Sequence, residues 1–558
     1  MEGREWGNFG MLECSNARMF AWHRDPSCID PATPRPRDLA TAVPAPPRRR
    51  DFATAVPVGP LMSTALTYHA ATKYHPATVG NGPGLDWAQQ PETLKRYDCP
   101  APVPLATWLP LDPNPFAQGE SPSLGPVGGV SLGALSRLIY FTYGITGMIP
   151  GASSPTYLRA APSAGGLYPA ELYLVVRDWP EVPPGLYGYD PTKHQLIPLW
   201  EDAAVAVQLA EACYGNAAVA AAPVCLVVTA VFQRSRWRYQ ERAYRRILLD
   251  TGHLLGNALL AAHALGLRAH ATTAFCDRWV GDLLRLDAAA EGALAVVAVN
   301  SLGPAERPSW TALPSSVGPA DAAPPLLDAL HRSSGLPATR PRLIAADDAG
   351  QDLAAHHGWS AGVALTDGLG PGALGEDICG ALLHRRSTRA FHRGSITRAQ
   401  LAAILATGYR PEACGLGPGG GFDRGRLMTF VAILDVGGLE PGVYYLSPHA
   451  LDLRPVRLGV TRDAVHHLCL GQDLGGDAAA VIFHTADLAA AVKVMGDRAY
   501  RHLHLDAGLI GQRLDLGALA EGAGASGIGG FFDDQAADLL GIPREQAIVY
   551  ITVLGVPA

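Results

Sequence analysis

The chain has 558 residues, of which 48% are hydrophobic, and its formal net charge is −7. This length accommodates two or three domains with sizeable cores, and the acidic balance argues against nucleic acid or an acidic membrane surface as the main partner. The nine cysteines are scattered without a CxxC pair, which fits a reducing cytoplasm better than a disulfide framework or a metal site such as zinc.

Residues 1–62 differ in composition from the rest of the chain. The stretch "DLATAVPAPPRRR" at 38–50 is followed by "DFATAVPV" at 51–58, a short duplication rich in Pro, Ala and Arg. Such a segment buries too little apolar surface to offset its ordering entropy, so we predict a disordered tail, with a basic targeting arm as the alternative. We find no apolar run of the roughly 18 residues that span a bilayer and no secretory signal, and we expect a cytoplasmic protein.

The first motif along the chain is a bare loop in front of a predicted strand, in "APSAGGLYPAELYLVV" at 161–176. The small residues Ser163–Gly166 let a flat ligand approach the backbone, because no side chain blocks it. The alternative is an ordinary tight turn. Apolar segments that are typical of strands occur at 171–176, 224–230, 294–301, 427–434 and 547–554.

One long apolar helix is predicted in each half of the chain, at 242–266 and at 498–522. Twenty-five residues make a helix of about 37 Å. Alanine and leucine fall on more than one face, so we expect each helix to be buried on several sides. Gly266 and Gly522 stand where a C-terminal cap is expected.

A low-complexity region from 304 to 375 separates the two halves. It is rich in Pro, Ala, Gly and Ser and shows no sustained hydrophobic period, apart from a helical piece near "PPLLDALHR". We interpret it as a linker between a domain at 63–303 and a domain at 376–558.

The two halves are copies of one another. Residues 242–284 align without a gap on 498–540, at a constant offset of 256 (498 − 242), and 17 of the 43 positions are identical. Weaker matches pair the segments that start at 185 and 442, and those that start at 296 and 548. We therefore predict a fused pseudo-dimer of two α+β domains. Each is expected to have a mixed or antiparallel sheet, surrounding helices and one central helix that packs against the other copy.

A second motif, "RRSTRAF", occupies 385–391 at the start of the second half. Arg385 and Arg389 lie four residues apart with Ser387 between them. Guanidinium groups bind phosphate in a bidentate manner and a hydroxyl adds a donor. For an isolated motif the alternative is a solvated basic turn at a helix end.

These motifs resemble those of the FMN-dependent nitroreductase superfamily. "RRSTRAF" is similar to its opening motif, and the loop at 161–176 is similar to the flavin loop of its SagB-type dehydrogenase branch, which includes thiazoline and oxazoline oxidases. "GLYGYDP" at 185–191, the stretch 242–267 and "GIGGFFDD" at 527–534 resemble further landmarks of that branch.

The resemblance implies FMN as the cofactor, held at the interface of two copies. It assigns the phosphate to Arg385, Ser387 and Arg389. It assigns the ring edge to Pro162, Ser163, Ala164, Gly165 and Gly166, and the N5 side of the ring to Gly529 and Gly530.

Each half carries only one of the two binding motifs. "FAQGESPSLGPVGG" at 116–129 stands where the first copy should have its arginines, and "CGLGPGGGFDRGR" at 414–426 replaces the bare loop in the second copy. We predict one composite pocket, with the phosphate held by the second half and the ring edge by the first. The pseudo-equivalent pocket lacks both motifs and is predicted to be empty.

The azoline oxidases carry a Lys–Tyr pair just ahead of the long helix, where this chain has Arg238 and Tyr239. The second copy has Val494 and Met495 there. A tyrosine accepts a proton if a nearby cation lowers its pKa from about 10, and Arg238 is the candidate cation. Arginine itself does not deprotonate in proteins, so the change from lysine weakens the azoline assignment. The alternative is that Tyr239 packs and Arg238 is a surface charge.

Two histidines are further acid–base candidates, His253 and His270. The second copy has Leu509 at the position of His253, which favours a packing role for that residue. The walls of the substrate pocket are expected in segments that no motif constrains, 143–158 and 410–426.

The sequence thus predicts an FMN-dependent oxidoreductase that oxidises a C–C or C–N single bond, such as an azoline to an azole in a modified peptide or other natural product. The expected partners are a peptide or small-molecule substrate and a peptide-modifying cyclodehydratase. One alternative is an NAD(P)H-dependent nitroreductase or quinone-type reductase. No GxGxxG motif follows a strand, so we expect no separate dinucleotide-binding domain, and the NAD(P)H of this alternative would stack directly on the flavin. The other is a non-catalytic scaffold that docks a biosynthetic partner.

Overall fold

The computed structural model describes residues 63–80, 84–97, 101–108, 130–151, 155–299, 309–311, 325–341, 343–345, 362–365, 373–416, 424–448 and 450–558. The predicted tail 1–62 and much of the predicted linker 304–375 lie outside these residues. Residues 62–76 and 84–558 belong to one compact unit. Of the second unit, which comprises 1–61 and 77–83, only the turn at 77–80 is described.

The first half folds around a seven-stranded antiparallel sheet in the order β1-β6-β5-β4-β7-β9-β8. Its central strand β4 is buried along its whole length, and Leu174 on it lies opposite Leu226 on one side and Tyr187 on the other. A separate two-stranded ribbon, β2-β3, precedes β4. The bounds are β1 Val103–Pro104, β2 Ile145–Ile149, β3 Thr156–Arg159, β4 Ala170–Val176, β5 Gly185–Asp190, β6 Gln195–Trp200, β7 Val224–Val231, β8 Ala269–Thr272 and β9 Glu291–Val299.

The second half repeats this topology, with the order β12-β16-β15-β14-β17-β19 and with β18 and β13 both paired to β19. Strands β16, β17, β18 and β19 of the second half correspond to β6, β7, β8 and β9 of the first. The bounds are β12 Val363–Ala364, β13 Phe391–His392, β14 Met428–Ile433, β15 Gly442–Ser447, β16 Asp452–Leu458, β17 Ala480–Ala486, β18 Gly524–Ile528 and β19 Ala547–Pro557. A small ribbon pairs β10 Ser309–Thr311 with β11 Leu343–Ala345. The predicted α+β fold of two tandem domains is confirmed.

Helices cover both faces of each large sheet. The outer faces pack against α3 and α7 in the first half and against α12 and α16 in the second, in two separate apolar clusters. The inner faces share one continuous core that includes the two long helices. The bounds are α1 Thr64–Ala71, α2 Leu132–Tyr143, α3 Ala204–Ala212, α4 Ala217–Ala221, α5 Phe232–Tyr239, α6 Ala243–Ala264, α7 Asp277–Leu284, α8 Leu326–Ser333, α10 Ile378–His384, α11 Arg398–Tyr409, α12 Arg462–Leu468, α13 Asp473–Gly476, α14 Leu488–Met495, α15 Ala499–Ala520 and α16 Asp533–Leu540.

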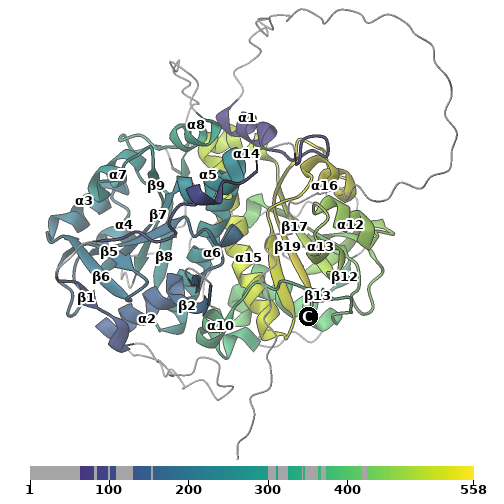
Figure 1. Cartoon of the computed structure of the whole chain (residues 1–558), viewed down its shortest axis with the longest axis horizontal. Coiled ribbons are helices and arrows are strands. Elements are labelled where there is room, and N and C mark those ends of the chain that lie inside the picture. The colour runs from purple at the N-terminus through teal and green to yellow at the C-terminus, as the bar shows by residue number, and fades with distance from the viewer. Residues whose placement is uncertain are drawn as a thin grey trace, which may run out of the picture. The chain divides into compact units, whose positions relative to one another are not determined.

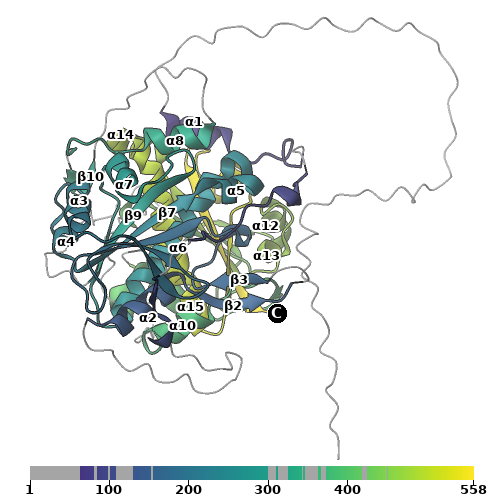
Figure 2. The same ribbon diagram turned by 60° about the vertical axis from the view of Figure 1, so that its left-hand side comes forward.

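Helices α6 and α15 lie side by side between the two sheets, as Figure 1 and the turned view of Figure 2 show. Each is buried along nearly its whole length, as predicted. Both end in the predicted glycine cap. Gly266 and Gly522 have a φ of +69°, and the amides of Leu267 and Ala523 donate to carbonyl oxygens five residues back, as in a Schellman motif.

Each copy is fastened to the other by an arm that precedes its own sheet. After α1, the amide of Tyr74 donates to Asp533 of the second copy at 2.9 Å. Arg242 and Arg245 at the start of α6 both pair with the same Asp533 carboxylate, at 2.8 and 2.7 Å. The Arg245 Nε also donates to the Thr72 hydroxyl at 3.0 Å. Buried charges are tolerated here because each is paired.

The mirror arrangement holds α8 against the first copy. Leu336 donates its amide to Asp277 at 2.8 Å, and Arg498 and Arg501 pair with that carboxylate. The Arg501 Nε donates to the Ser334 hydroxyl at 2.7 Å. Burial alone would raise the pKa of Asp277, but the two guanidinium groups outweigh it and lower the pKa to about 2. The helical piece predicted inside the linker is thus the counterpart of α1.

Candidate functional site

The bare loop at 163–166 is anchored on the long helix of its own copy. Ser163 donates its hydroxyl to the Asp250 carboxylate at 2.6 Å, and the Ala164 amide donates to the same group at 3.1 Å. The Ser163 oxygen also accepts the Tyr168 amide at 2.9 Å. The hydroxyl and amide that were predicted to bind a ring edge therefore donate to a carboxylate here, and they fix the shape of the loop.

Gly165 brings this loop to the predicted acid–base tyrosine. Its φ is +66°, and a methyl group at this position would lie 2.7 Å from the Tyr239 hydroxyl. Gly166 has the same φ, but a methyl group there would meet no atom within 4 Å. The loop is thus glycine-rich for two reasons: a left-handed backbone at both positions, and a close approach of Tyr239 at one of them.

Arg246 on α6 is the cation that contacts Tyr239. Its guanidinium carbon lies 3.9 Å from the centre of the Tyr239 ring, whereas that of Arg238 lies 5.9 Å away. Arg238 lies instead beside the largely exposed Trp87, with 6.0 Å to its ring. The structure therefore gives Tyr239 a nearer cation than the predicted one.

Tyr74, from the arm after α1, is the second tyrosine at Arg246. The Tyr74 side chain is close enough to Arg246 for that charge to act on its hydroxyl, and its ring lies 4.1 Å from the Arg242 guanidinium. Burial alone would raise the pKa of Tyr74, but the charges of Arg246 and Arg242 outweigh it and lower the pKa. The backbones of Tyr74 and Phe532 also form an isolated parallel β-bridge. Phe532 follows the predicted Gly529 and Gly530 by two to three residues in the sequence.

The two predicted glycines after β18 face different neighbours. A methyl group at Gly529 would lie 3.4 Å from the Arg246 Nε, so this backbone forms a wall beside Arg246. A methyl group at Gly530 would meet Leu470 at 3.0 Å, and the Gly530 carbonyl accepts the Gln472 side chain at 3.2 Å. Of this pair, Gly529 is therefore the one that lies with Tyr239 and Arg246.

Arg385 joins the second half to the bare loop of the first. Its Nε donates to the Ala160 carbonyl at 3.0 Å, two residues ahead of Pro162. Its other nitrogens reach the Arg159 carbonyl and the Ser387 hydroxyl, both at 3.4 Å. Arg385 is buried, Ser387 is half-buried and Arg389 is exposed, so the three predicted phosphate ligands become more exposed from Arg385 to Arg389.

Arg386, the neighbour that was not predicted, strengthens this junction. Its Nη2 donates to the carbonyl of Thr146 on β2 at 2.6 Å. The ribbon β2-β3 falls in the segment predicted as a substrate-pocket wall, and Met148 on it is 53% exposed. The arginine motif therefore contacts both the residues just ahead of the bare loop and the segment predicted as a pocket wall.

Two buried carboxylates lie in this region, Asp250 beside Ser163 and Asp515 near Arg385. Burial raises the pKa of Asp250 to about 7, although hydrogen bonds from Ser163 and Ala164 and the charge of Arg246 lower it. Burial raises the pKa of Asp515 to about 6 against the opposing charge of Arg385. Both groups change protonation close to neutral pH, which is common at functional sites.

His253 links the two copies rather than facing an open site. Its Nδ1 lies 2.8 Å from Gln512 and its Nε2 lies 2.9 Å from the Tyr550 hydroxyl. Burial lowers its pKa to about 4, so the ring is neutral. These contacts agree with the packing role predicted for His253.

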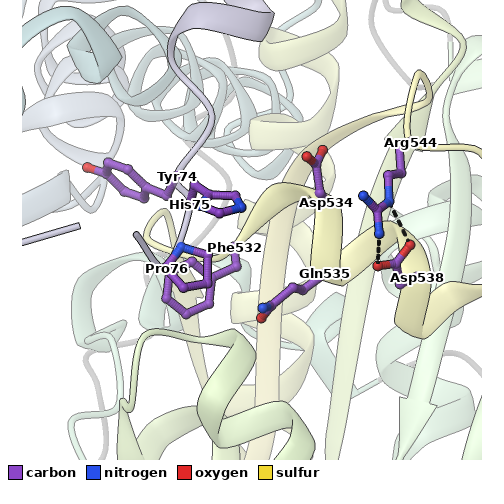
Figure 3. A pocket seen from close by; sticks show the side chains of 8 residues that line it. All are labelled: Tyr74, His75, Pro76, Phe532, Asp534, Gln535, Asp538 and Arg544. Atoms are coloured by element: carbon purple, nitrogen blue, oxygen red, sulfur yellow. Dashed lines mark hydrogen bonds and ion pairs between the residues drawn. The ribbon is translucent and has the colours of Figure 1, made fainter. Parts of the chain in front are cut away.

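A recess of about 180 Å³ lies next to this site. Figure 3 shows its lining, in which the Tyr74 ring extends away from Asp538 and Arg544. Arg544 forms a two-fold hydrogen bond with Asp538, and Asp534 pairs with Lys73 at 2.7 Å. The recess is lined by Tyr74, His75, Pro76, Phe532, Asp534, Gln535, Asp538 and Arg544.

The pseudo-equivalent position in the second copy carries different chemistry. His502 occupies the place of Arg246, and its Nδ1 lies 3.1 Å from the Thr273 hydroxyl. Met495 occupies the place of Tyr239 and is buried. The replacement loop at 417–423 lies outside the described residues. The acid–base and cationic groups described above thus occur on one side of the pseudo-dimer.

Sequence reasoning missed Arg246, Tyr74 and Arg386. The sequence did contain a signal for Arg246: the aligned repeat has His502 at this position, so the arginine is specific to the first copy, as Tyr239 is. Tyr74 had none, because only the long-range bridge to Phe532 brings it to the site. Within the described ranges there is no cluster of three or more potential metal ligands, and no helix long and apolar enough to cross a membrane.

Comparison with solved structures finds a crystal structure of a nitroreductase-family protein from Anabaena variabilis. It is 40% identical, matches 89% of this chain and 100% of its own, and has a TM-score of 0.78. At most about a tenth of this chain is left unmatched, so a single chain of that protein spans both copies.

Two curated relatives are named as processing proteins. The trifolitoxin-processing protein TfxB of Rhizobium leguminosarum bv. trifolii is 30% identical over 210 residues, which are 37% of this chain and 56% of TfxB. The microcin B17-processing protein McbC of Escherichia coli is 29% identical over 140 residues, 23% of this chain and 49% of McbC. The matches span about half the length of each relative.

The model of the nitroreductase family matches residues 130–300 and 382–556, one match in each copy and together more than half of the chain. The two matched segments contain both long helices, most strands of the repeated sheets, and the site residues Tyr239, Arg246 and Arg385, whereas Tyr74 lies outside them. The chain therefore belongs to the nitroreductase family, as two tandem copies of its domain.

Proposed function

We propose that this protein is an FMN-dependent dehydrogenase of the SagB type with one composite flavin site per chain. The observation that carries the proposal is the 3.0 Å hydrogen bond from Arg385 to the Ala160 carbonyl. Through it, the only RRSxR motif and the only PSAGG loop in the sequence meet, although they belong to different copies.

The groups gathered here fit FMN. Gly165 and Gly166 form a backbone ledge without side chains, and Gly529 forms a second one. Arg385, Ser387 and Arg389 lead from the buried junction to the surface, where a phosphate dianion remains partly hydrated. Arg246 has a buried nitrogen, Nη1, with no hydrogen-bond partner, as expected where a ligand with acceptor atoms belongs. When bound, FMN supplies a two-electron acceptor for a hydride.

Tyr239 is the residue proposed to hold the proton that leaves the substrate carbon. Its hydroxyl faces the Gly165 backbone, and the Arg246 guanidinium packs against its ring at 3.9 Å. Gly165 keeps the space beside the hydroxyl free of a side chain. Arg238 cannot serve as the base, and its position on Trp87 suits a role in orienting the segment.

The proposed substrate is an azoline ring in a modified peptide or a related natural product, which is oxidised to an azole. This class is supported by the similarity to TfxB and McbC, which are named as processing proteins of a toxin and a microcin. A cyclodehydratase that makes the azoline is the proposed partner. The absence of the Lys of the Lys–Tyr pair leaves the identity of the ring open.

The first experiment is the absorption spectrum of the purified protein, with the released flavin identified and counted. The proposal predicts FMN at one per chain, and a flavin-free protein would favour the scaffold alternative. Bleaching of the flavin by NADH or NADPH at a rate that supports turnover would instead favour the reductase alternative, which the family name also suggests.

A further inference from the structure

Arg246 differs from the four buried arginines at the junction of the copies that pair with Asp533 or Asp277. Arg242, Arg245, Arg498 and Arg501 each pair with a carboxylate within 3 Å. Among the residues that the structure describes, no carboxylate lies within ion-pair distance of Arg246. Its side chain is nevertheless only 6% exposed. A buried cation without a counter-ion is costly, so such a group is usually kept for a ligand.

The surroundings of Arg246 hold the guanidinium without neutralising it. The Tyr239 ring packs against the guanidinium at 3.9 Å, and the charge of Arg246 acts on the nearby Tyr74 side chain. The Gly529 backbone approaches Nε and brings no side chain. One nitrogen, Nη1, is buried and has no hydrogen-bond partner. Two aromatic side chains and a glycine thus fix a donor that lacks an acceptor.

We propose that Arg246 is the anion-binding group of this site and donates to a negatively charged oxygen or nitrogen acceptor of the bound ligands. The inference rests on the proposed function, because it needs a flavin or substrate beside Gly165 and Gly529. Two sources share this chemistry: the electron-rich edge of the flavin ring, which gains negative charge on reduction, and a carboxylate of the substrate.

The second copy supports a ligand role over a packing role. Arg242, Arg245 and Asp250 recur there as Arg498, Arg501 and Asp506, whereas Arg246 is replaced by His502. A helix-packing requirement would act on both symmetric positions. The guanidinium is present only on the side that also has Tyr239 and the bare loop.

The test compares wild-type holoenzyme with Arg246→Gln, Arg246→Lys and the matched control His502→Gln. Two quantities are measured: the affinities for oxidised and for reduced FMN, and the binding of benzoate against neutral benzamide, followed by the visible spectrum of the bound flavin. Loss of one charge-assisted hydrogen bond typically weakens binding by roughly tenfold to a hundredfold.

If the acceptor belongs to the flavin, Arg246→Gln should lose that factor in affinity for the reduced form beyond any loss for the oxidised form. This equals a fall in reduction potential of about 30–60 mV, at 29.6 mV per tenfold. If the acceptor belongs to the substrate, benzoate binding should fall by the same factor while benzamide binding and the potential stay unchanged. Arg246→Lys should recover part of either effect, and His502→Gln should show neither.

Wild-type values of both quantities in Arg246→Gln would overturn the inference, as would an equal loss of affinity for both forms of FMN with benzoate binding intact. If Arg246→Gln retains no flavin, the flavin content of Arg246→Lys decides. Flavin bound to Arg246→Lys supports a role for the positive charge, whereas loss of flavin from this variant too means that the shape of the arginine side chain is needed and overturns the inference. A wild-type protein without flavin would instead defeat the proposed function itself.

Discussion

Gly252 and Gly508 face each other where α6 crosses α15, and neither position has room for a side chain. A methyl group at Gly508 would lie 2.3 Å from the Leu249 carbonyl oxygen and 3.0 Å from the Gly252 α-carbon. A methyl group at Gly252 would lie 2.3 Å from the Leu505 carbonyl oxygen. The contact is backbone against backbone, so the two copies are pressed together at their centre.

Gly508→Ala should therefore lower the free energy of unfolding by about 2 kcal/mol or more, since backbone atoms must separate. The control is Gly281→Ala in α7, where a methyl group would meet nothing within 4 Å. There the substitution should be neutral or stabilise by up to about 1 kcal/mol, through helix propensity. Chemical denaturation of both variants checks the pair. Equal stabilities would contradict the close crossing.

Gly165→Ala and Gly166→Ala separate backbone strain from the contact with Tyr239. Both glycines have a φ of +66°, so alanine costs about 1–2 kcal/mol at either position. Only Gly165→Ala also places a methyl group 2.7 Å from the Tyr239 hydroxyl. We expect Gly165→Ala to lose much more flavin than Gly166→Ala at equal stability loss. Flavin retention after gel filtration measures this, and equal retention would argue against the contact.

Arg385→Ala should yield a pale protein with one tenth or less of the wild-type FMN affinity, because it loses a buried cation at the junction of the motifs. Arg389→Ala should act in the same direction. Arg424→Ala and Arg426→Ala, in the replacement loop of the second copy, should retain FMN. Two flavins per chain, or a second half that retains FMN when expressed alone, would refute the composite site.

Tyr239→Phe removes a hydroxyl and little volume. It should keep FMN bound and slow substrate oxidation by roughly 10²-fold or more, the usual scale for a general acid or base. The reductive half-reaction in a stopped-flow experiment measures the step directly. Tyr444→Phe, which removes a hydroxyl that donates to the Glu440 carbonyl far from Arg246, is the matched control. Normal flavin reduction in Tyr239→Phe would assign that residue to packing.

Asp250→Asn should change how stability depends on pH. The folded-state pKa of Asp250 is raised to about 7, so the folded protein binds more protons than the unfolded chain between the ordinary carboxyl pKa and pH 7. Its carboxylate therefore costs stability progressively as pH rises through this window. The asparagine variant should gain on wild type from pH 5 to pH 8, by about 1 kcal/mol or more. Asp515 is present in both proteins and cancels in the difference.

Thermal unfolding of wild type and Asp250→Asn at pH 5, 6, 7 and 8 gives this difference. If the stability of Asp250→Asn minus that of wild type stays constant or falls as pH rises, Asp250 remains ionised in the folded protein. The hydrogen bonds from Ser163 and Ala164 would then outweigh its burial.

The long helices and buried strands were predictable because their signals are local. The helix predicted at 242–266 is α6 at Ala243–Ala264, and the strand predicted at 224–230 is β7 at Val224–Val231. Apolar composition and a glycine cap carry that information within one stretch of chain. The repeat alignment added the pairing of the copies, which the shared core of α6 and α15 bears out.

The detailed make-up of the site was less accessible, because it depends on contacts between distant segments. The sequence predicts Ser163 as a hydrogen-bond donor to a ligand. Only the folded chain shows that its hydroxyl donates to the Asp250 carboxylate. Arg238 precedes Tyr239 in sequence, yet the nearer cation is Arg246, two helical turns further on. Tyr74 lies 165 residues before Tyr239 and reaches the site through an arm that docks on the other copy.

The segments after α1 and α8 dock reciprocally on Asp533 and Asp277, and dilution cannot separate the two copies because one covalent chain contains both. In a dimer of identical subunits every substitution alters both pockets, and the pair dissociates at low concentration. In this chain the halves are always equimolar, and any residue can be changed on one side alone. A fused pair can therefore carry the RRSxR motif and the PSAGG loop once each, in different halves, as this sequence does.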